Sequence, residues 1–437
     1  MNQGPIKVAI LGINYAPEPT GIAPYTTGLA RGLAERGHEV EVLTGFQHYP
    51  QWERAAGSAR FRKEEIDEHV RVRRLSHHVP RNPGGFGRGF MELTFGLQLL
   101  TTRWNRPDVV ICVSPPLLAS MLSAVRARLA WRRPAVGLVL HDVYSTGVVE
   151  VAAMSRGPAH LVQMLESATA RLVDSVAVIH DGFTNVLVDQ LGVDRGRIRA
   201  IRNWNHVGTP DPVASAAFRE AHGWHADEVV ILHAGNMGAK QGLENVIAAA
   251  KLAARGNSCA RFILLGDGNQ RARLEAAAAG LSTVEFLAPV SEEVFPAALG
   301  AADVLLVNER PGIARMAVPS KLTSYFTSGK PILAATDAGG LTAQEIIASG
   351  AGVVVPADRP DLLLTEAVRL GQDRAFAAQL GEAGHRYSAA ALSADAALDS
   401  YERWIVDLAE MRRRSGTIAE LPPIYGAGAC VPREPTG

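Results

Sequence analysis

Cysteine is scarce in this sequence of 437 residues. The three cysteines, Cys112, Cys259 and Cys430, stand far apart and form no C-x-x-C pair, which excludes a zinc ribbon and a disulfide-stapled scaffold. No run approaches the roughly 20 apolar residues that span a bilayer, and the polar start at residues 1–5 does not resemble a secretory signal. We therefore expect a cytoplasmic protein whose only contact with a membrane is peripheral, on the inner face.

An overall excess of charge of one sign is also missing. Lysine and arginine total 44, as do aspartate and glutamate, which argues against a nucleic-acid-binding protein. The balance is uneven along the chain, because residues 1–205 hold 24 basic and 18 acidic side chains and the rest hold 20 and 26. A basic first half suits an anionic surface, although solubility explains these numbers equally well.

Two ligand-binding motifs are absent as well. Gly12-Ile13-Asn14 breaks the G-x-G of a dinucleotide fingerprint, and the next apolar segment ends in Thr44-Gly45, without an acid for a ribose. No D-x-D motif offers carboxylates to a divalent cation. The sequence therefore argues against nicotinamide-dependent oxidation, and we expect neither a resident cofactor nor a metal requirement.

Short apolar segments alternate with segments of helical periodicity along most of the chain. Strands are predicted at residues 7–12, 39–44, 70–75, 109–113, 136–140 and 175–179, and again at 229–235, 261–266, 284–287, 304–307, 331–334 and 352–355. This alternation is typical of a doubly wound parallel sheet, and it restarts after Pro210 and Pro212. We predict two Rossmann-like α/β domains, 1–207 and 208–385, facing each other across a cleft, with helices at 386–414 that return to the first domain and an irregular tail at 415–437.

Glycine-rich turns follow two strands of the second half. Residues 235–242 (GNMGAKQG) combine three glycines with Lys240 between a strand and a helix, an arrangement that suits the pyrophosphate of a leaving nucleotide. Gly266-Asp267-Gly268 ends the next strand in the same way. A solvated lysine and glycines needed only for the turns are the alternatives.

The first half offers a glycine before a helix and a histidine after a strand. Gly21 ends the loop 12–21 and allows backbone amides to approach a phosphate oxygen. His141-Asp142 follows an apolar strand and therefore lies at a carboxyl edge, where open α/β sheets bind ligands. A turn glycine and a structural histidine are the alternatives.

These motifs together resemble one enzyme family. They are KVAILGINYAPEPTGIAPYTTGLARGLAERGHEVEVLTG, IRNWN, HAGNMGAKQGLENVIAAA, FILLGDGNQRARLE, FLAPVSEEVFPAALGAADVLLV, VPSKLTSYFTSGKPILAATDAGG and YERWI. The chain, to about residue 405, is similar to the retaining glycosyltransferases of group 1 (GT4), which have the GT-B fold. Within them it looks most like the branch of colanic-acid, fucose and fucosamine transferases.

The resemblance implies that the second domain holds a nucleoside-diphosphate sugar and the first holds the acceptor. It implies catalytic roles for His141 and Lys240. The donor would be bound by Gly21, Asn236, Gly238, Lys240, Gly266, Asp267, Leu287, Pro289, Val290, Ser320, Lys321 and Ser324. The acceptor side would hold Asn14, Tyr15, Glu18 and Tyr25.

The chain departs from the family pattern at three positions. Asn236 stands where an arginine is common, and Met316 and Ser324 stand where the family has two glutamates, the second of which usually holds the ribose. Ser320 is a suitable N-cap for a helix at 321–327. We expect Lys321, at the start of that helix, to supply the cation that Asn236 lacks, unless it points to solvent.

The expected function is transfer of a sugar, UDP- or GDP-linked, to a lipid-linked saccharide in polysaccharide biosynthesis, with retention of configuration. Front-face attack, in which the departing phosphate takes the acceptor's proton, explains why no convincing carboxylate pair stands out. A nucleotide-sugar epimerase and a non-catalytic sugar-nucleotide-binding subunit remain alternatives.

The segment 60–106 predicts the membrane contact. Eight cations and four acids between residues 60 and 88 precede a helical pattern with Phe90, Leu93, Leu97 and Leu100 on one face, as in interfacial helices. The alternative is a helix whose apolar face packs against the core.

Overall fold

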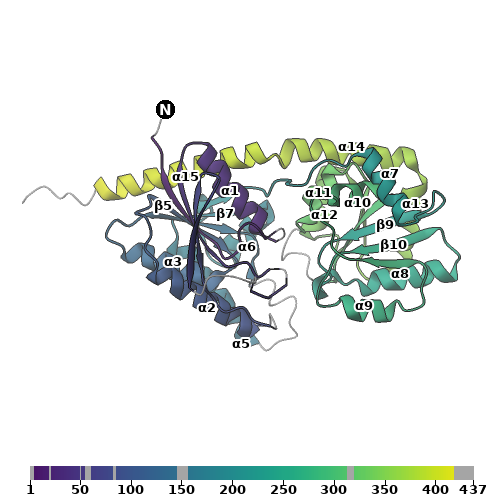
Figure 1. Ribbon diagram of the computed structural model, residues 1–437, viewed down its shortest axis with the longest axis horizontal. Helices are drawn as coiled ribbons and strands as arrows, with labels where there is room; N and C mark the ends of the chain where they lie inside the picture. The colour runs from purple at the N-terminus through teal and green to yellow at the C-terminus, as the bar shows by residue number, and fades with distance from the viewer. Residues whose placement is uncertain are drawn as a thin grey trace, which may run out of the picture.

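In the computed structural model, two α/β domains lie side by side, each with one central sheet (Figure 1). The structure describes residues 4–18, 21–49, 51–54, 61–81, 85–144, 156–312 and 319–417. Among these residues, none of the helices has the length and the hydropathy needed to cross a bilayer.

The first sheet has eight strands in the order β3-β4-β2-β1-β5-β6-β7-β8. Its strands are β1 (Lys7–Leu11), β2 (Glu39–Gly45), β3 (Arg62–Asp67), β4 (Val70–Leu75), β5 (Val109–Ser114), β6 (Ala135–Leu140), β7 (Ser175–Val178) and β8 (Ile198–Ala200). Helices α2 (Gly85–Thr101), α3 (Leu117–Leu129), α5 (Arg156–Leu172) and α6 (Asp181–Asp189) cover one face, and α1 (Ala23–Glu35) and α15 (Ala394–Thr417) cover the other.

The second sheet has six parallel strands in the order β11-β10-β9-β12-β13-β14. Its strands are β9 (Val229–Ala234), β10 (Ala260–Leu265), β11 (Val284–Leu287), β12 (Val304–Asn308), β13 (Ile332–Ala335) and β14 (Gly352–Val355). Helices α8 (Glu244–Arg255), α9 (Arg271–Ala277) and α13 (Pro360–Gln372) cover one face. Helices α7 (Pro212–Ala221), α10 (Phe295–Ala301), α11 (Lys321–Thr327), α12 (Leu341–Ser349) and α14 (Arg374–Ala391) lie on the other side.

The predicted pair of doubly wound domains is confirmed, and each predicted strand is present with ends that differ by at most one residue. Parallel strands buried on both faces are continuous apolar runs, which makes them easy to recognise. The prediction missed β3 and β8. β3 reads RKEEID, is largely exposed and pairs antiparallel with β4 at the edge of the sheet, so it carries no apolar signal.

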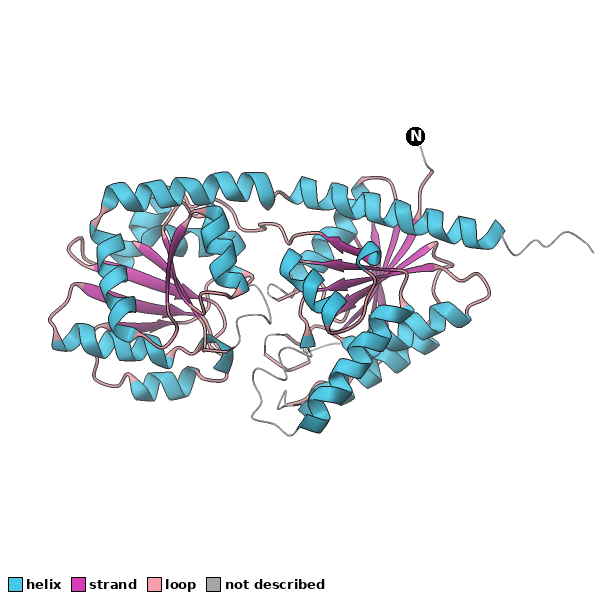
Figure 2. Cartoon of the chain, turned by 180° about the vertical axis from the view of Figure 1, so that it is seen from behind, coloured by secondary structure: helices cyan, strands magenta, loops and turns pink. Residues whose placement is uncertain are grey.

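The C-terminal helices cross between the domains later than expected. The predicted boundary at residue 386 falls inside α14, which packs against α11 and α13 of the second domain. Only α15 returns to the first domain, and Figure 2 shows the two helices following one another along the same side of the molecule. A Cβ on Gly137 of β6 would lie 2.5 Å from the ring of Trp404 on α15. Glycine at this position therefore allows α15 to pack closely on the sheet. Of the predicted tail, residues 415–417 extend α15, and the rest lies outside the described residues.

Candidate active site

The carboxyl edges of the two sheets are held facing one another by a buried carboxylate. Glu345 on α12 accepts hydrogen bonds from Nε2 of His180, which follows β7, and from Arg202, both at 2.8 Å. Tyr387 donates to its second oxygen at 2.7 Å. Nδ1 of His180 accepts a hydrogen bond from the amide of Gly182. The ring proton is therefore on Nε2, which donates the hydrogen bond to Glu345. This network joins the segments after β7 and β8 of the first sheet to α12 and α14 of the second domain.

Backbone packing shapes the glycine-rich edge of the second sheet. The loop after β10 lies directly on the loop after β9, because a Cβ on Gly266 would stand 2.0 Å from the Gly235 carbonyl oxygen and one on Gly268 would stand 2.5 Å from that of Met237. Both glycines have positive φ angles, 140° and 157°. Glycine is therefore required here by the contact between the loops, and the arrangement leaves Gly235 and Asn236 exposed at the edge.

Lys240 lies in the short 3₁₀ turn Ala239–Gln241 of the same loop, with its side chain exposed. The end of β12 holds this loop in place. The amide of Arg310 donates to the Lys240 carbonyl oxygen at 2.9 Å, and the Asn308 side chain donates to the carbonyls of Gln241 and Gly242. Burial raises the pKa of Asp142, which follows β6, and the positive charge of Lys240 partly offsets that rise. Lys240 therefore interacts electrostatically with the first domain.

Lys321 approaches this loop from the first residue of α11. Its Nζ lies 3.1 Å from Nε2 of His233, a fully buried histidine of β9, and 3.6 Å from the position of a Cβ on Gly235. Burial lowers the pKa of Lys321 to about 7, an effect that the nearby Glu309 carboxylate opposes. Burial and the Lys321 charge together hold the pKa of His233 well below its usual range. One exposed lysine, Lys240, thus lies in this loop, and one half-buried lysine, Lys321, lies beside it.

The serine positions near Lys321 differ from the expected pattern. Ser320 occupies the N-cap position of α11, but its backbone is already helical and its side chain caps no amide. Ser324 is buried, and its hydroxyl donates to the Lys321 carbonyl at 2.9 Å. The Ser320 hydroxyl therefore does not cap the helix as the sequence predicted, and the Ser324 hydroxyl is bonded within its own helix. Met316 lies outside the described residues.

The remaining donor-side candidates line the ends of β10 and β11. Asp267 is exposed, and its carboxylate accepts from the amide of Gly268 at 2.7 Å. The Leu287 carbonyl accepts from Gly266, which ties the two strand ends together. Pro289 is exposed and Val290 is half-buried against the core. These residues lie together beside the glycine loops.

His141 is buried at the end of β6, as its position in the sequence predicted. Its ring centroid lies 5.9 Å from that of Tyr25, and its Nδ1 lies 3.5 Å from the amide nitrogen of Asn203. Burial lowers the pKa of His141 to about 4, so the imidazole is neutral at physiological pH. Burial also raises the pKa of Tyr25 to about 12. Tyr25 and His141 form a neutral, polar pair at this edge.

Three of the four acceptor-side candidates are engaged within the first domain. Tyr15 is buried and donates to Asp67 at 2.8 Å, and burial and that hydrogen bond raise its pKa. Glu18 is buried and accepts from Asn14 at 2.7 Å and from the amides of His48 and Tyr49. Tyr15 and Glu18 are therefore hydrogen-bonded within the first domain, and their placement at the acceptor stays a prediction.

The sequence analysis missed side chains of the loop after β2. A Cβ on Gly21, whose φ is 70°, would lie 3.2 Å from the Tyr49 ring, and Tyr49 in turn lies 5.9 Å from the ring of Trp52. His233, Asn203 and Glu309 were missed as well. Each of the five lies in a strand or in the segment that follows one, which is the signal that could have identified them.

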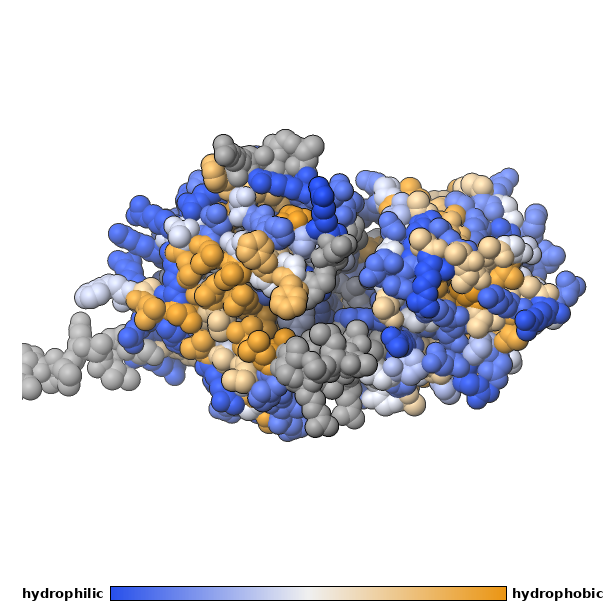
Figure 3. Space-filling model, turned by 90° about the horizontal axis from the view of Figure 1, so that it is seen from below, coloured by the Kyte–Doolittle hydropathy of each residue, from blue (hydrophilic) through white to orange (hydrophobic). Residues whose placement is uncertain are grey.

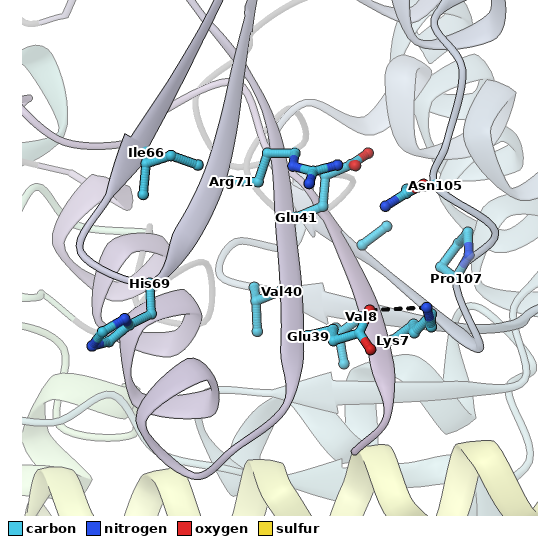
Figure 4. Close-up of a pocket in the computed structure, with 11 residues that line it drawn as sticks. Lys7, Val8, Glu39, Val40, Glu41, Ile66, His69, Arg71, Asn105 and Pro107 are labelled. Atoms are coloured by element: carbon cyan, nitrogen blue, oxygen red, sulfur yellow. Dashed lines mark ion pairs between the residues drawn. The ribbon is translucent and has the colours of Figure 1, made fainter.

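One surface pocket lies at the opposite edge of the first sheet. It is formed at the amino ends of β1, β2 and β4, with Lys7 and Glu39 paired at 2.9 Å across its mouth (Figure 4). Ligands of doubly wound sheets bind at the carboxyl edge, so this pocket is separate from the candidate site.

Among the described residues, no three side chains of histidine, cysteine, aspartate or glutamate are grouped as metal ligands would be.

Comparison with protein families divides the chain as the two sheets do. Residues 20–204 match the model of a glycosyl transferase 4-like domain, and residues 228–373 match that of glycosyl transferases group 1. The chain is 31% identical over 335 residues to the putative colanic acid biosynthesis glycosyl transferase WcaI of Escherichia coli, covering 74% of this chain and 82% of that protein. It is 28% identical to the probable glycosyltransferase WbjE of Pseudomonas aeruginosa, over 63% of this chain and 69% of that protein.

Solved structures with the same fold come from several glycosyltransferases. Sucrose-phosphate synthase of Thermosynechococcus elongatus superposes with a TM-score of 0.71 at 17% identity, over 95% of this chain and all of that one. Anabaena HepE in complex with UDP gives 0.66 at 15% identity, over 92% and 100%. The GT-B fold expected from the sequence is thereby confirmed.

Proposed function

Because this chain belongs to the group 1 glycosyltransferases, we propose that it transfers a sugar from a UDP- or GDP-linked donor to an acceptor, with retention at the anomeric carbon. The observation that best supports this is the exposed glycine loop with Lys240 opposite the buried, neutral His141. HepE, which has this fold, is solved with UDP and with UDP-glucose.

On the donor side, cations and backbone amides would stabilise the departing diphosphate. Negative charge develops on the phosphate as the glycosidic bond breaks, so Lys240 and Lys321 would stabilise the transition state more than the bound donor. The amides of Gly21 and Asn236 would add neutral donors, while the Gly238 amide already donates to Gln241 at 3.1 Å. The nucleoside would lie along Gly266, Asp267, Leu287, Pro289 and Val290.

His141 would position the transferred sugar or the acceptor hydroxyl. A neutral imidazole both donates and accepts hydrogen bonds, whereas an imidazolium beside the anomeric centre would oppose the positive charge that develops there. In front-face attack the departing phosphate oxygen takes the acceptor's proton, and therefore no carboxylate base is needed beside His141. Tyr25 and Asn203, which border His141, would hold its ring in place.

The acceptor would be a lipid-linked saccharide at the cytoplasmic membrane, bound by the first domain (1–207), while the second (208–385) binds the donor. The Escherichia coli relative is named for colanic acid biosynthesis, which supports a role in building a polysaccharide. The aromatic residues Tyr49 and Trp52 beside Gly21 are suited to stacking on a sugar ring.

Calorimetry with UDP, GDP and ADP, followed by their sugars, tests the donor proposal. A ligand at 100 times its dissociation constant adds about 2.7 kcal/mol to the free energy of unfolding. In a scan of thermal unfolding, a rise in the melting temperature with the nucleotides of one base alone would therefore identify the base of the donor. Absence of binding to every nucleotide would contradict the proposal.

Two alternative functions would give different results when the protein is incubated with its donor. An epimerase would convert the donor to an isomer without any acceptor. A non-catalytic binding subunit, suggested by Met316 and Ser324 in place of the family's two glutamates, would bind a nucleotide tightly yet transfer nothing to a membrane extract that supports a homologous transferase.

A further inference from the structure

Exposed apolar side chains gather on three adjacent helices of the first domain. Of the fifteen large hydrophobic residues exposed in the described part of the chain, eight lie on α2, α3 and α5, and α3 contacts both of the others. We call this surface the α2–α3–α5 face. It consists of Phe86, Phe90, Leu93, Leu97, Val125, Leu129, Leu161 and Met164. Figure 3 shows a broad hydrophobic area gathered on one side of the first domain.

Helix α2 is apolar on two sides, and only one of them is used by the core. Met91, Phe95 and Leu99 are buried against the sheet. Phe90 and Leu97, on the other side, remain 52% and 49% exposed. The face predicted from the sequence as interfacial is thus the one that the core leaves uncovered, and the core-packing alternative is wrong for these residues. Such a contiguous apolar surface usually marks a binding surface.

The exposed charges of the described part of these three helices are all positive. Their sequences contain two acidic residues, Glu92 and Glu166, and both are buried, where they accept hydrogen bonds from the amides of Leu118 and Tyr144. Arg88 and Arg171 are the exposed described arginines of these helices, whereas Arg126 donates to the carbonyls of Leu99 and Thr102 and Arg128 pairs with Asp174. Trp131, fully exposed, follows α3 and is itself followed by Arg132 and Arg133. An apolar surface with arginines and no exposed acid complements an anionic lipid surface.

The face adjoins the candidate active site through the first turns of α2. Crossover helices run antiparallel to the strands, so α2 begins at the carboxyl edge of the sheet. The Arg88 guanidinium lies 5.6 Å from the centre of the Trp52 ring, and its charge lowers the pKa of both Tyr49 and Asp142 against the effect of burial. Phe86 and Phe90 therefore lie on the part of the face nearest to the site.

We infer that the α2–α3–α5 face binds to the surface of an anionic bilayer, with its apolar side chains among the acyl chains and the exposed Arg88, Arg171, Arg132 and Arg133 at the headgroups. The inference deepens the proposed function, because it explains how a lipid-linked acceptor could remain in the bilayer while its saccharide reaches Tyr49 and His141. Trp131 suits the headgroup level, where tryptophan is enriched.

Vesicle sedimentation of the purified full-length protein, without donor or acceptor, tests this inference. We expect pelleting with vesicles containing phosphatidylglycerol, and weaker pelleting with pure phosphatidylcholine or at high salt. Combined substitution of Phe86→Ser, Phe90→Ser and Leu97→Ser should weaken partitioning at least about tenfold. The matched control, Val213→Ser with Ile347→Ser, alters equally exposed apolar residues of the second domain and should bind as wild type.

The outcomes separate this inference from the proposed function. Failure of the wild type to pellet at low salt, or equal pelleting of the triple variant, would overturn the membrane contact and leave nucleotide binding untouched. A wild-type dimer that the triple variant converts to a monomer would show that a second copy covers the face, which also overturns it. Unchanged UDP or GDP affinity and thermal unfolding of the triple variant would show that its loss of binding reflects the surface alone.

Discussion

At the edge of the second sheet, backbone atoms and two lysines are presented, whereas at the facing edge of the first sheet, aromatic and imidazole side chains are presented. Gly266 and Gly268 let two loops lie on one another, with Lys240 and Lys321 beside them. On the first sheet, Tyr25 and His141 are buried and neutral. One edge therefore suits a charged diphosphate common to many donors, and the other suits neutral hydroxyl groups that differ between acceptors.

The largest effect is expected at the edge of the first sheet, which we call the side-chain edge; the edge of the second sheet is the backbone edge. His141→Ala should lower the turnover by about 10²–10⁴, because a positioned polar group commonly contributes that much. Nucleotide affinity, which we propose depends on the edge of the second sheet, should stay the same. Steady-state transfer rates and calorimetry with the preferred nucleotide measure the two quantities.

His225→Ala is the control for this substitution. His225 is exposed and precedes β9, at the far edge of the second sheet, so its loss should change neither quantity. Wild-type turnover in His141→Ala would make His141 structural and would remove the distinction between the two edges.

The next effect falls on the backbone edge. Gly266→Ala places a Cβ 2.0 Å from the Gly235 carbonyl oxygen at a φ of 140°, and the strain should cost roughly 3 kcal/mol of unfolding free energy. The displaced loop should also lose nucleotide affinity. Urea unfolding and calorimetry measure both. Gly339→Ala, where a Cβ meets nothing within 4 Å, should behave as wild type; equal stability of the two variants would contradict the packing argument.

The same contrast accounts for what the sequence could predict. The strands of both sheets were found because parallel strands buried on both faces are unbroken apolar runs. The glycine loops were found because glycines clustered at the end of a strand usually mark a close approach of the backbone. The backbone edge was therefore largely predictable.

The side-chain edge was not, because its contacts join distant segments. Tyr15 was expected at the acceptor, but its partner Asp67 lies 52 residues away on β3, the charged edge strand that the apolar pattern could not reveal. Glu18 was likewise expected there, although it is bonded to the amides of His48 and Tyr49. Because β3 was missed, the sequence could not show that the Tyr15 hydroxyl is bonded to Asp67.

The free energy of unfolding should fall between pH 6.5 and pH 4 because of two buried histidines at the carboxyl edge of the first sheet, His77 after β4 and His141 after β6. Burial lowers the pKa of His77 to about 3 and that of His141 to about 4, whereas an unfolded histidine titrates near 6.5. Below pH 6.5 the unfolded state therefore binds more protons, and folding becomes less favourable as the pH falls. From pH 7 to pH 5, each histidine should cost about 2 kcal/mol. Urea unfolding at both pH values should show a smaller loss in His77→Phe; an unchanged loss would mean that other groups titrate.

The smallest effect concerns Lys321, which lies half-buried beside His233. Lys321→Ala should weaken nucleoside diphosphate about tenfold, the lower end of a charge-assisted contact, and should hardly affect the nucleoside. Lys251→Ala, which removes an exposed lysine of α8, is the control.

The pH dependence sharpens this last test. Since the pKa of Lys321 is about 7, its ammonium is charged below that value and is lost as the pH rises toward 8. Diphosphate affinity of the wild type should therefore fall between pH 6 and pH 8 more steeply than that of Lys321→Arg, whose guanidinium stays charged. Lys240 and the nucleotide are common to both proteins, so the difference between their pH profiles belongs to Lys321. Parallel profiles, together with an unchanged affinity in Lys321→Ala, would leave Lys240 and the backbone amides to bind the diphosphate without it.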